Sequence, residues 1–77
     1  MRVVISGAGS AGIAVAEILL AVGITDVVVL DSKGALHTGR DDLEGMKRDL
    51  AGRSNPRAVA GGTEAALSGA DVFVGVS

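Results

Sequence analysis

Short apolar runs alternate with helical patterns along this chain. Residues 3–5 and 27–30 are continuously apolar, and residues 72–76 are interrupted only by Gly75. Such runs are typical of strands in a parallel sheet that is covered on both faces. Strands are therefore predicted at residues 3–6, 27–30 and 72–76.

The segments between these strands carry the periodicity of helices. Helices are predicted at residues 11–22, 41–53 and 63–68. Gly23 suits the left-handed position that often follows a helix. Asn55 precedes a proline, which disfavours helical angles and ends the second helix. Thr63 suits the N-cap of the third helix, because its hydroxyl can accept a hydrogen bond from a free amide of the first turn.

The helix predicted at residues 11–22 is apolar on nearly every side, and Glu17 is its only charged residue. A helix that covers one face of a sheet needs only a single apolar stripe. We therefore expect a domain or subunit outside this chain to bury the remaining apolar surface of this helix.

The second predicted helix has an ordinary amphipathic pattern. Leu43, Met46 and Leu50 fall on one side, which we expect to face the core. The basic residues in and around this segment are expected to face solvent. They are Arg40, Lys47, Arg48, Arg53 and Arg57.

The order of these elements predicts an α/β fold. The connections are too long for hairpins and include helices, so the strands should be parallel and joined by right-handed crossovers. The strand after residue 71 should lie beside the first strand, on the side opposite the second. That order creates a switch point at the carboxyl edge of the sheet, where open α/β folds bind ligands. A further short edge strand is expected at residues 58–60.

Composition narrows the class of protein. The chain has 77 residues, 48% of them hydrophobic, with one Phe and no Trp or Tyr, so its core must be aliphatic. A net charge of −2 gives no attraction for nucleic acid or an anionic membrane. The absence of cysteine excludes disulfides and thiolate metal sites. No apolar stretch reaches the ~20 residues of a membrane span. We expect a cytoplasmic protein, and a fragment of a larger one because strands lie close to both ends.

Three glycines follow the first strand with the spacing Gly-x-Gly-x-x-Gly. In a dinucleotide-binding turn the first, Gly7, allows the tight turn, and the second, Gly9, lets the backbone approach a pyrophosphate. The third, Gly12, lets the helix pack closely on the sheet, and free amides at the helix start attract the anion. We predict a Rossmann-like fold, the alternative being a glycine-rich turn in another α/β fold. The predicted cofactor-binding residues of the loop are Gly7, Ala8, Gly9, Ser10, Ala11 and Gly12.

An acid ends the second strand, nineteen residues after the last of these glycines. Asp31 stands where a carboxylate can accept hydrogen bonds from both hydroxyls of the adenosine ribose, which favours NAD. Ser32 and Lys33 follow at once, and a lysine there can receive the 2′-phosphate of NADP, so both cofactors stay open. The alternatives are that Asp31 caps a turn and that Lys33 is a solvated loop residue.

Other residues give weaker signals. Val76 and Ser77 end the last strand near the expected nicotinamide ribose, either as cofactor contacts or simply as the end of the strand. His37 lies in a polar loop without a partner acid and hydroxyl, and we assign it no catalytic role. The acids within residues 41–44 have the spacing of a helix N-terminus stabilised by the helix dipole, so no metal site is assigned to them.

The chain resembles the NAD(P)-binding domain of malic enzymes, especially the short bacterial type. The resemblance rests on residues 3–14, 31–35, 39–40, 55–56 and 69–77, and it covers essentially the whole chain. Many dehydrogenases share the glycine loop. The combination of Asp-x-Lys-Gly with Gly-Ala-Asp-Val-Phe-Val-Gly-Val-Ser is considerably more specific.

This resemblance implies a larger homo-oligomeric enzyme that converts malate to pyruvate by oxidative decarboxylation, reduces NAD(P) and uses Mg or Mn. Residues 1–77 would form its NAD(P)-binding domain, with the cofactor role on the glycine loop and Asp31, and Ser32 and Lys33 discriminating NAD from NADP. The acid/base Tyr and Lys and the metal carboxylates of the family have no counterpart here, so no catalytic residue is expected. The alternatives are the NAD-binding module of another dehydrogenase and a non-enzymatic nucleotide-sensing regulatory domain.

Overall fold

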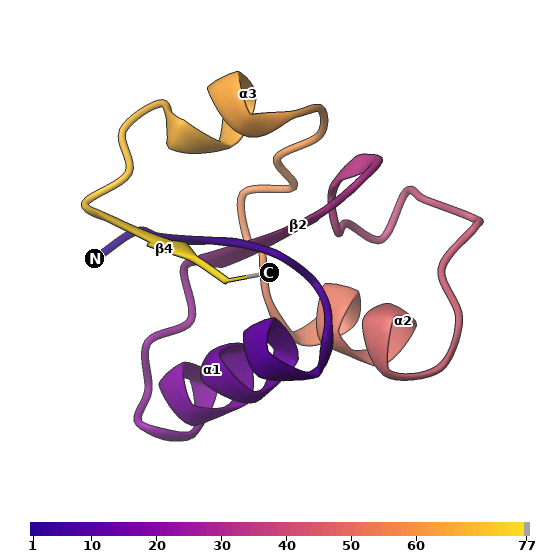
Figure 1. Cartoon of the computed structure of the whole chain (residues 1–77), viewed down its shortest axis with the longest axis horizontal. Coiled ribbons are helices and arrows are strands. Elements are labelled where there is room, and N and C mark those ends of the chain that lie inside the picture. The colour runs from indigo at the N-terminus through magenta and orange to yellow at the C-terminus, as the bar shows by residue number, and fades with distance from the viewer. Residues whose placement is uncertain (77) are drawn as a thin grey trace.

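Within residues 1–76, which the computed structural model describes, a four-stranded sheet carries helices on both faces (Figure 1). The strands are β1 (Val3–Ser6), β2 (Val27–Asp31), β3 (Gly34–Ala35) and β4 (Val72–Gly75). The helices are α1 (Ser10–Ala21), α2 (Gly45–Arg53) and α3 (Thr63–Leu67). The sheet order is β3-β2-β1-β4, and β1 runs parallel to β2 and β4. The predicted α/β class and the place of the last strand beside the first are confirmed.

Alternate side chains of the central strands pack into two separate cores. Val3 and Ile5 of β1 belong to the cluster that α1 and α2 cover, which includes Leu50. Val4 points to the opposite face, where the cluster includes Ala66 of α3. Figure 1 shows the same division, with α1 and α2 on one side of the strands and α3 on the other. The uninterrupted apolar pattern of β1 therefore reflects burial on both faces of the sheet.

The second helix begins later than its pattern predicted. It was expected from residue 41, but α2 starts at Gly45, and Glu44 before it is extended. Leu43 is buried as a loop residue, so it does not share a helical stripe with Met46, which is exposed. The inward face of α2 is formed by Leu50 instead, together with its neighbour Ala51. The predicted stripe through Met46 is wrong because the helix starts after Leu43.

A hairpin that the pattern did not predict extends the sheet beyond β2. β3 pairs antiparallel with the end of β2, with Asp31 opposite Gly34 across the two-residue turn formed by residues 32–33. Gly34 has a φ of 116°, a left-handed value that favours glycine. A Cβ there would also overlap the carbonyl oxygen of Gly61. The expectation of a purely parallel sheet is therefore wrong at this edge.

The edge strand expected at residues 58–60 does not form, and that segment of the described chain has no regular secondary structure. The Asn55 side chain holds it in a turn, accepting a hydrogen bond from the Val59 amide and donating one to the Val59 carbonyl, each of 2.9 Å. The same amide group of Asn55 also donates to the Leu36 carbonyl at 3.1 Å. These side-chain bonds occupy the backbone groups that strand pairing would have used.

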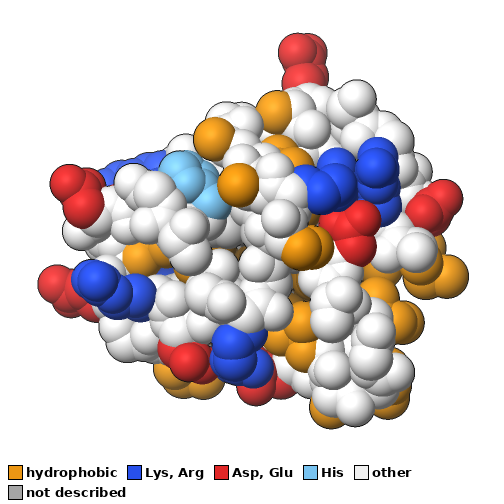
Figure 2. Space-filling view, turned by 180° about the vertical axis from the view of Figure 1, so that it is seen from behind, with side chains coloured by type: hydrophobic (Ala, Val, Ile, Leu, Met, Phe, Trp, Pro, Cys, Tyr) orange, Lys and Arg blue, Asp and Glu red, His pale blue; other side chains and the backbone are white. Residues whose placement is uncertain are grey.

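Several apolar side chains remain exposed at the surface. β4 was expected to be buried, but it is an edge strand of the described sheet, and its Phe73 is half exposed. Ile18 and Val22, in and just after α1, are exposed too, in agreement with the all-round apolar pattern of that helix. On the face seen in Figure 2, apolar side chains lie among acidic and basic groups. None of the helices in residues 1–76 is long and apolar enough to cross a membrane.

Two glycine substitutions in helices should change stability in opposite directions. A Cβ at Gly12 would overlap the carbonyl oxygen of Gly7, whereas a Cβ at Gly52 in α2 would meet nothing within 4 Å. We predict that Gly12→Ala lowers the free energy of unfolding by about 2 kcal/mol through overpacking. Gly52→Ala, the matched control, should raise it by about 0.5–1 kcal/mol through helix propensity. Urea unfolding followed by far-ultraviolet circular dichroism tests both changes, and a Gly12→Ala chain as stable as the parent would contradict the close contact at Gly12.

Candidate functional site

The glycine loop connects β1 to α1 through two close backbone contacts. Gly7 has a φ of 116°, its amide donates to the Leu30 carbonyl at 2.9 Å, and a Cβ on it would overlap the Val76 carbonyl oxygen. Gly12 packs against the carbonyl of Gly7 in the same way. The fold itself therefore explains why these two positions are glycines.

Gly9 differs from the other two glycines of the motif. A Cβ built on it would meet no atom within 4 Å, and its φ of −80° is open to any residue. Gly9 precedes the first turn of α1, which has no side-chain cap and no acidic residue. The amide N–H groups of that turn are available to an anion, and the positive end of the helix dipole favours one. Packing within the chain gives no reason for glycine here, whereas the approach of a ligand does.

Two open pockets meet at this loop, on the carboxyl edge of β1, β2 and β4. The larger, of about 390 Å³, is lined by Ser6, Gly7, Ala8, Gly9, Leu30, Asp31, Ser32 and Lys47. The smaller, of about 210 Å³, is lined by Gly7, Gly9, Ser10, Ala11, Gly12 and Val76. Because both pockets include Gly7 and Gly9, they form one track across the switch point of the sheet, where α/β folds bind their ligands.

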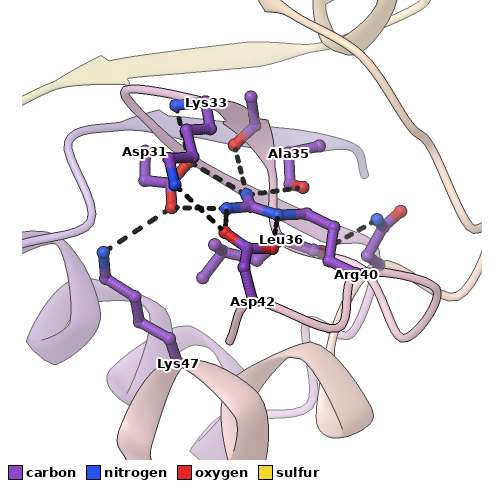
Figure 3. Close-up of polar contacts among 9 residues, drawn as sticks. Asp31, Lys33, Ala35, Leu36, Arg40, Asp42 and Lys47 are labelled. Atoms are coloured by element: carbon purple, nitrogen blue, oxygen red, sulfur yellow. Dashed lines mark hydrogen bonds and ion pairs between the residues drawn. The ribbon is translucent and has the colours of Figure 1, made fainter. Parts of the chain in front are cut away.

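Asp31 lies at one end of this track and is held by Arg40 (Figure 3). Arg40 donates from Nη1 to Oδ1 at 2.9 Å and from Nη2 to Oδ2 at 3.0 Å. These bonds from Arg40 lower the pKa of the Asp31 carboxyl below its ordinary value, and a bond from the Lys33 amide to Oδ1 at 2.9 Å lowers it further. Asp31 therefore caps the hairpin turn and carries a full negative charge at neutral pH.

Arg40 also bonds to groups other than Asp31. Its Nε and Nη2 donate to the two carboxylate oxygens of Asp42 at 3.0 and 2.7 Å, which lowers the pKa of Asp42 to about 2. Its Nη1 reaches the carbonyls of Gly34 at 3.3 Å and Ala35 at 3.2 Å. The Arg40 side chain is only 11% exposed. Its assignment to a solvated face is wrong, because it ties the β2–β3 hairpin to the loop before α2.

Two lysines lie near the carboxylates of Asp31 and Asp42, one beside each. Lys47 Nζ lies 3.6 Å from Asp31 Oδ2, and Lys47 reaches the larger pocket from the first turn of α2. Lys33 is 72% exposed, and its Nζ lies 3.8 Å from Asp42 rather than in the pocket. Sequence reasoning gave neither Arg40 nor Lys47 a role at this site and assigned both to a solvated face. Arg40 belongs to the Gly39–Arg40 pair that contributes to the resemblance, whereas Lys47 had no signal beyond the basic residues around it.

Of the other residues singled out from the sequence, Val76 lies on the track and His37 lies away from it. Val76 lines the smaller pocket and donates its amide to Ser6 at 2.9 Å, while Ser77 lies outside the described residues. His37 accepts a hydrogen bond at Nδ1 from the Gly39 amide at 3.1 Å and lines a separate pocket of about 360 Å³. Among residues 1–76, no three His, Asp or Glu side chains converge as metal ligands would.

The whole length of this chain matches one segment of malic enzymes. It is 40% identical over 78 residues to the bifunctional malic/malolactic enzyme of Bacillus subtilis (strain 168), and covers 19% of that protein. It is 44% identical over 78 residues to the NADP-dependent malic enzyme of Halomonas elongata, where the match covers 99% of this chain and 18% of that protein. The chain thus spans less than a fifth of the length of these curated relatives. No protein-family model matches it.

A solved structure shares the fold. The NAD-dependent malic enzyme of Thermotoga maritima superposes with a TM-score of 0.90 at 38% identity, over 99% of this chain and 22% of that one. The α/β fold predicted from the sequence is therefore the fold of a malic enzyme segment. The resemblance to malic enzymes, inferred from the glycine loop and the strand ends, is confirmed over this length.

Acid should weaken the chain through the Arg40 network. Asp31 and Asp42 have lowered pKa values in the folded chain, so between about pH 4, the ordinary carboxyl value, and pH 2 the unfolded chain binds more protons. The stability that these two carboxylates contribute is therefore fully present above this pH window, and it is lost as the pH falls through the window. We predict that Arg40→Gln costs about 2 kcal/mol at pH 7 and that the difference from the parent chain shrinks towards pH 2. Urea midpoints at pH 7, 4 and 2.5 measure it, and a constant difference at all three would refute the network's role.

Proposed function

We propose that this chain is the dinucleotide-binding part of a malic-type oxidoreductase. The full-length protein would oxidise and decarboxylate malate to pyruvate while reducing NAD or NADP. The observation that carries the proposal is the open space at Gly9, which lies on the track between the start of α1 and Asp31. The whole-length match to proteins named as NAD- and NADP-dependent malic enzymes supports the same cofactor class.

The track offers each part of a dinucleotide a chemically suitable place. The amides of residues 7–12 and the positive end of α1 would bind the pyrophosphate, which Gly9 allows to approach the backbone closely. Asp31, with Ser32 and Lys33 beside it, would bind the adenosine ribose. Val76, and Ser77 after it, would lie near the nicotinamide ribose, since Val76 lines the other end of the track.

In this proposal the chain binds and orients the cofactor, and it supplies no catalytic residue. Hydride transfer is the chemistry of the bound nicotinamide. The described residues do not fit a divalent metal, since no suitable group of ligands converges among them. We therefore assign the Mg or Mn site and the acid/base residues to parts of the protein outside this chain.

The exposed apolar surface and the malic enzyme match support a proposal about assembly and location. The exposed apolar residues Ile18 and Val22 support a neighbouring domain or subunit that covers α1. We propose a cytoplasmic homo-oligomer on this basis and on the malic enzyme match. With a net charge of −2, the chain is not expected to bind nucleic acid or a membrane surface.

Dinucleotide binding can be tested on the 77-residue chain by amide nuclear magnetic resonance titration with NAD and with NADP. We expect shifts in residues 7–12 and around Asp31. Gly9→Ala should keep the parent spectrum, because a methyl group fits there, but weaken either dinucleotide roughly tenfold by blocking the close approach of the pyrophosphate. Gly52→Ala serves as the matched control and should bind like the parent.

The possible outcomes separate the proposal from its rivals. A folded chain that ignores both dinucleotides would refute the binding role. Binding that is unaffected by Gly9→Ala would place the ligand elsewhere on the surface. Attaching the chain to its flanking sequence and measuring malate-dependent NAD(P) reduction then distinguishes a malic-type enzyme from another dehydrogenase or from a nucleotide sensor, which would show no turnover with malate.

A further inference from the structure

A third pocket lies away from the dinucleotide track, between the loop of residues 37–43 and α2. It has a volume of about 360 Å³ and shares no lining residue with the two pockets of the track. Leu43 and Ala51, both almost fully buried, form its apolar part, and the charged residues Asp41 and Arg48 line it as well. A space of this size that combines apolar surface with a few polar groups is typical of a site for a small molecule.

The pocket contains two opposite charges that are not paired. Every Lys and Arg side chain except that of Arg48 forms an ion pair within residues 1–76. Asp41 has no ion pair in that part of the chain either, and none joins it to Arg48 although both residues line the same pocket. A ligand with one anionic and one cationic group would therefore find a free partner for each group without breaking an existing pair.

Neighbouring residues add hydrogen-bond donors suited to a carboxylate. His37 Nδ1 accepts a hydrogen bond from the Gly39 amide at 3.1 Å, so the proton of the neutral imidazole is on Nε2, which is left as a donor. Thr38, which also lines the pocket, adds a hydroxyl. The guanidinium of Arg48 has several donors in one plane, a geometry that matches a carboxylate. Asp41, in contrast, can only accept, and it suits an ammonium group.

The loop that lines this pocket is held in shape within the chain. The Arg40 amide donates to the His37 carbonyl at 3.1 Å, which closes a turn over residues 37–40. The Arg40 side chain ties the same loop to the β2–β3 hairpin through Asp31 and two hairpin carbonyls. A ligand would therefore bind without the entropic cost of ordering this loop.

We propose that this pocket binds a small zwitterion, an α-amino acid with an aliphatic side chain. Its carboxylate pairs with Arg48, its ammonium group pairs with Asp41, and its side chain packs on Leu43 and Ala51. A dicarboxylate such as malate fits less well, because its second carboxylate would face Asp41. This site is separate from the proposed dinucleotide site, and either can fail without the other.

Amide nuclear magnetic resonance titration of the 77-residue chain with L-alanine, L-valine and L-leucine tests the proposal. At least one of them should shift the amides of residues 37–41 and 48–52 and leave those of residues 7–12 in place. We expect a dissociation constant on the order of 1 mM, because exposed charge pairs contribute little affinity. Malate should bind roughly fivefold more weakly than the amino acid, as expected for a repulsive charge beside Asp41.

Variants assign each charge of the ligand to its partner. Arg48→Gln and Asp41→Asn should each weaken the amino acid roughly three- to fivefold, the loss expected for one exposed charge pair. Lys33→Gln and Glu44→Gln are the matched controls, since they make the same charge changes outside the pocket, and they should alter binding less than about 1.5-fold. The N-acetyl derivative of the amino acid lacks the ammonium group. Its binding should therefore be insensitive to Asp41→Asn and still be weakened by Arg48→Gln.

The contrary outcomes are equally specific. The absence of shifts with all three amino acids, or binding that is unchanged in Arg48→Gln and Asp41→Asn, would overturn the proposal. Malate or acetate binding as tightly as the amino acid would indicate a site for a simple anion and would overturn the role of Asp41. Both variants change exposed side chains, so their dispersed spectra should match that of the parent. The response of residues 7–12 to NAD and NADP is measured separately, so failure here leaves the dinucleotide site standing.

Discussion

The close approach of three backbone segments at the carboxyl end of β1 determines how the rest of the molecule is arranged. Gly7 lies against the Val76 carbonyl and Gly12 against the Gly7 carbonyl, with no room for a side chain at either contact. These contacts bring the start of α1 to the point where β1 and β4 end. The switch point of the sheet, the free amides of the helix and the two pockets meet there as a consequence. Gly9 makes no such contact, and the space where its Cβ would lie is unoccupied.

Arg40 fixes the other end of the track by a different kind of interaction. Its guanidinium bonds to Asp31, to Asp42 and to two carbonyls of the hairpin, so it joins a strand end to a loop that precedes α2. Such a planar group with several donors can satisfy acceptors in three segments at once, which a lysine at that position could not. The interaction holds the β2–β3 hairpin and the Asp31 end of the larger pocket in one geometry.

The sequence predicted those parts of the fold that depend on local patterns. The strands at residues 3–6 and 27–30 and the helix of α1 follow from apolar periodicity and from Gly23 after the helix, which has a φ of 91°. The hairpin at Gly34 depends on a close contact with Gly61, and the late start of α2 goes with the burial of Leu43 in a loop. Neither can be predicted from the local sequence, because each depends on residues that are distant along the chain. The glycine loop was found from its spacing together with the strand before it, the helix after it and the acid at the end of the second strand. Arg40 was misassigned because its partners lie on other segments.

The ion pair of Asp31 with Arg40 changes how an acid at the end of a strand should be interpreted. Such an acid favours NAD because a carboxylate accepts from the ribose hydroxyls and repels a 2′-phosphate. Both effects assume that the carboxylate is unpaired. A guanidinium that bonds to both of its oxygens removes acceptor positions and most of the local charge, although the acid itself stays ionised. The identity of the residue is therefore insufficient to assign the cofactor. The relevant quantity is the summed charge of Asp31 and the side chains paired with it. These include Lys47, which α2 brings to the pocket.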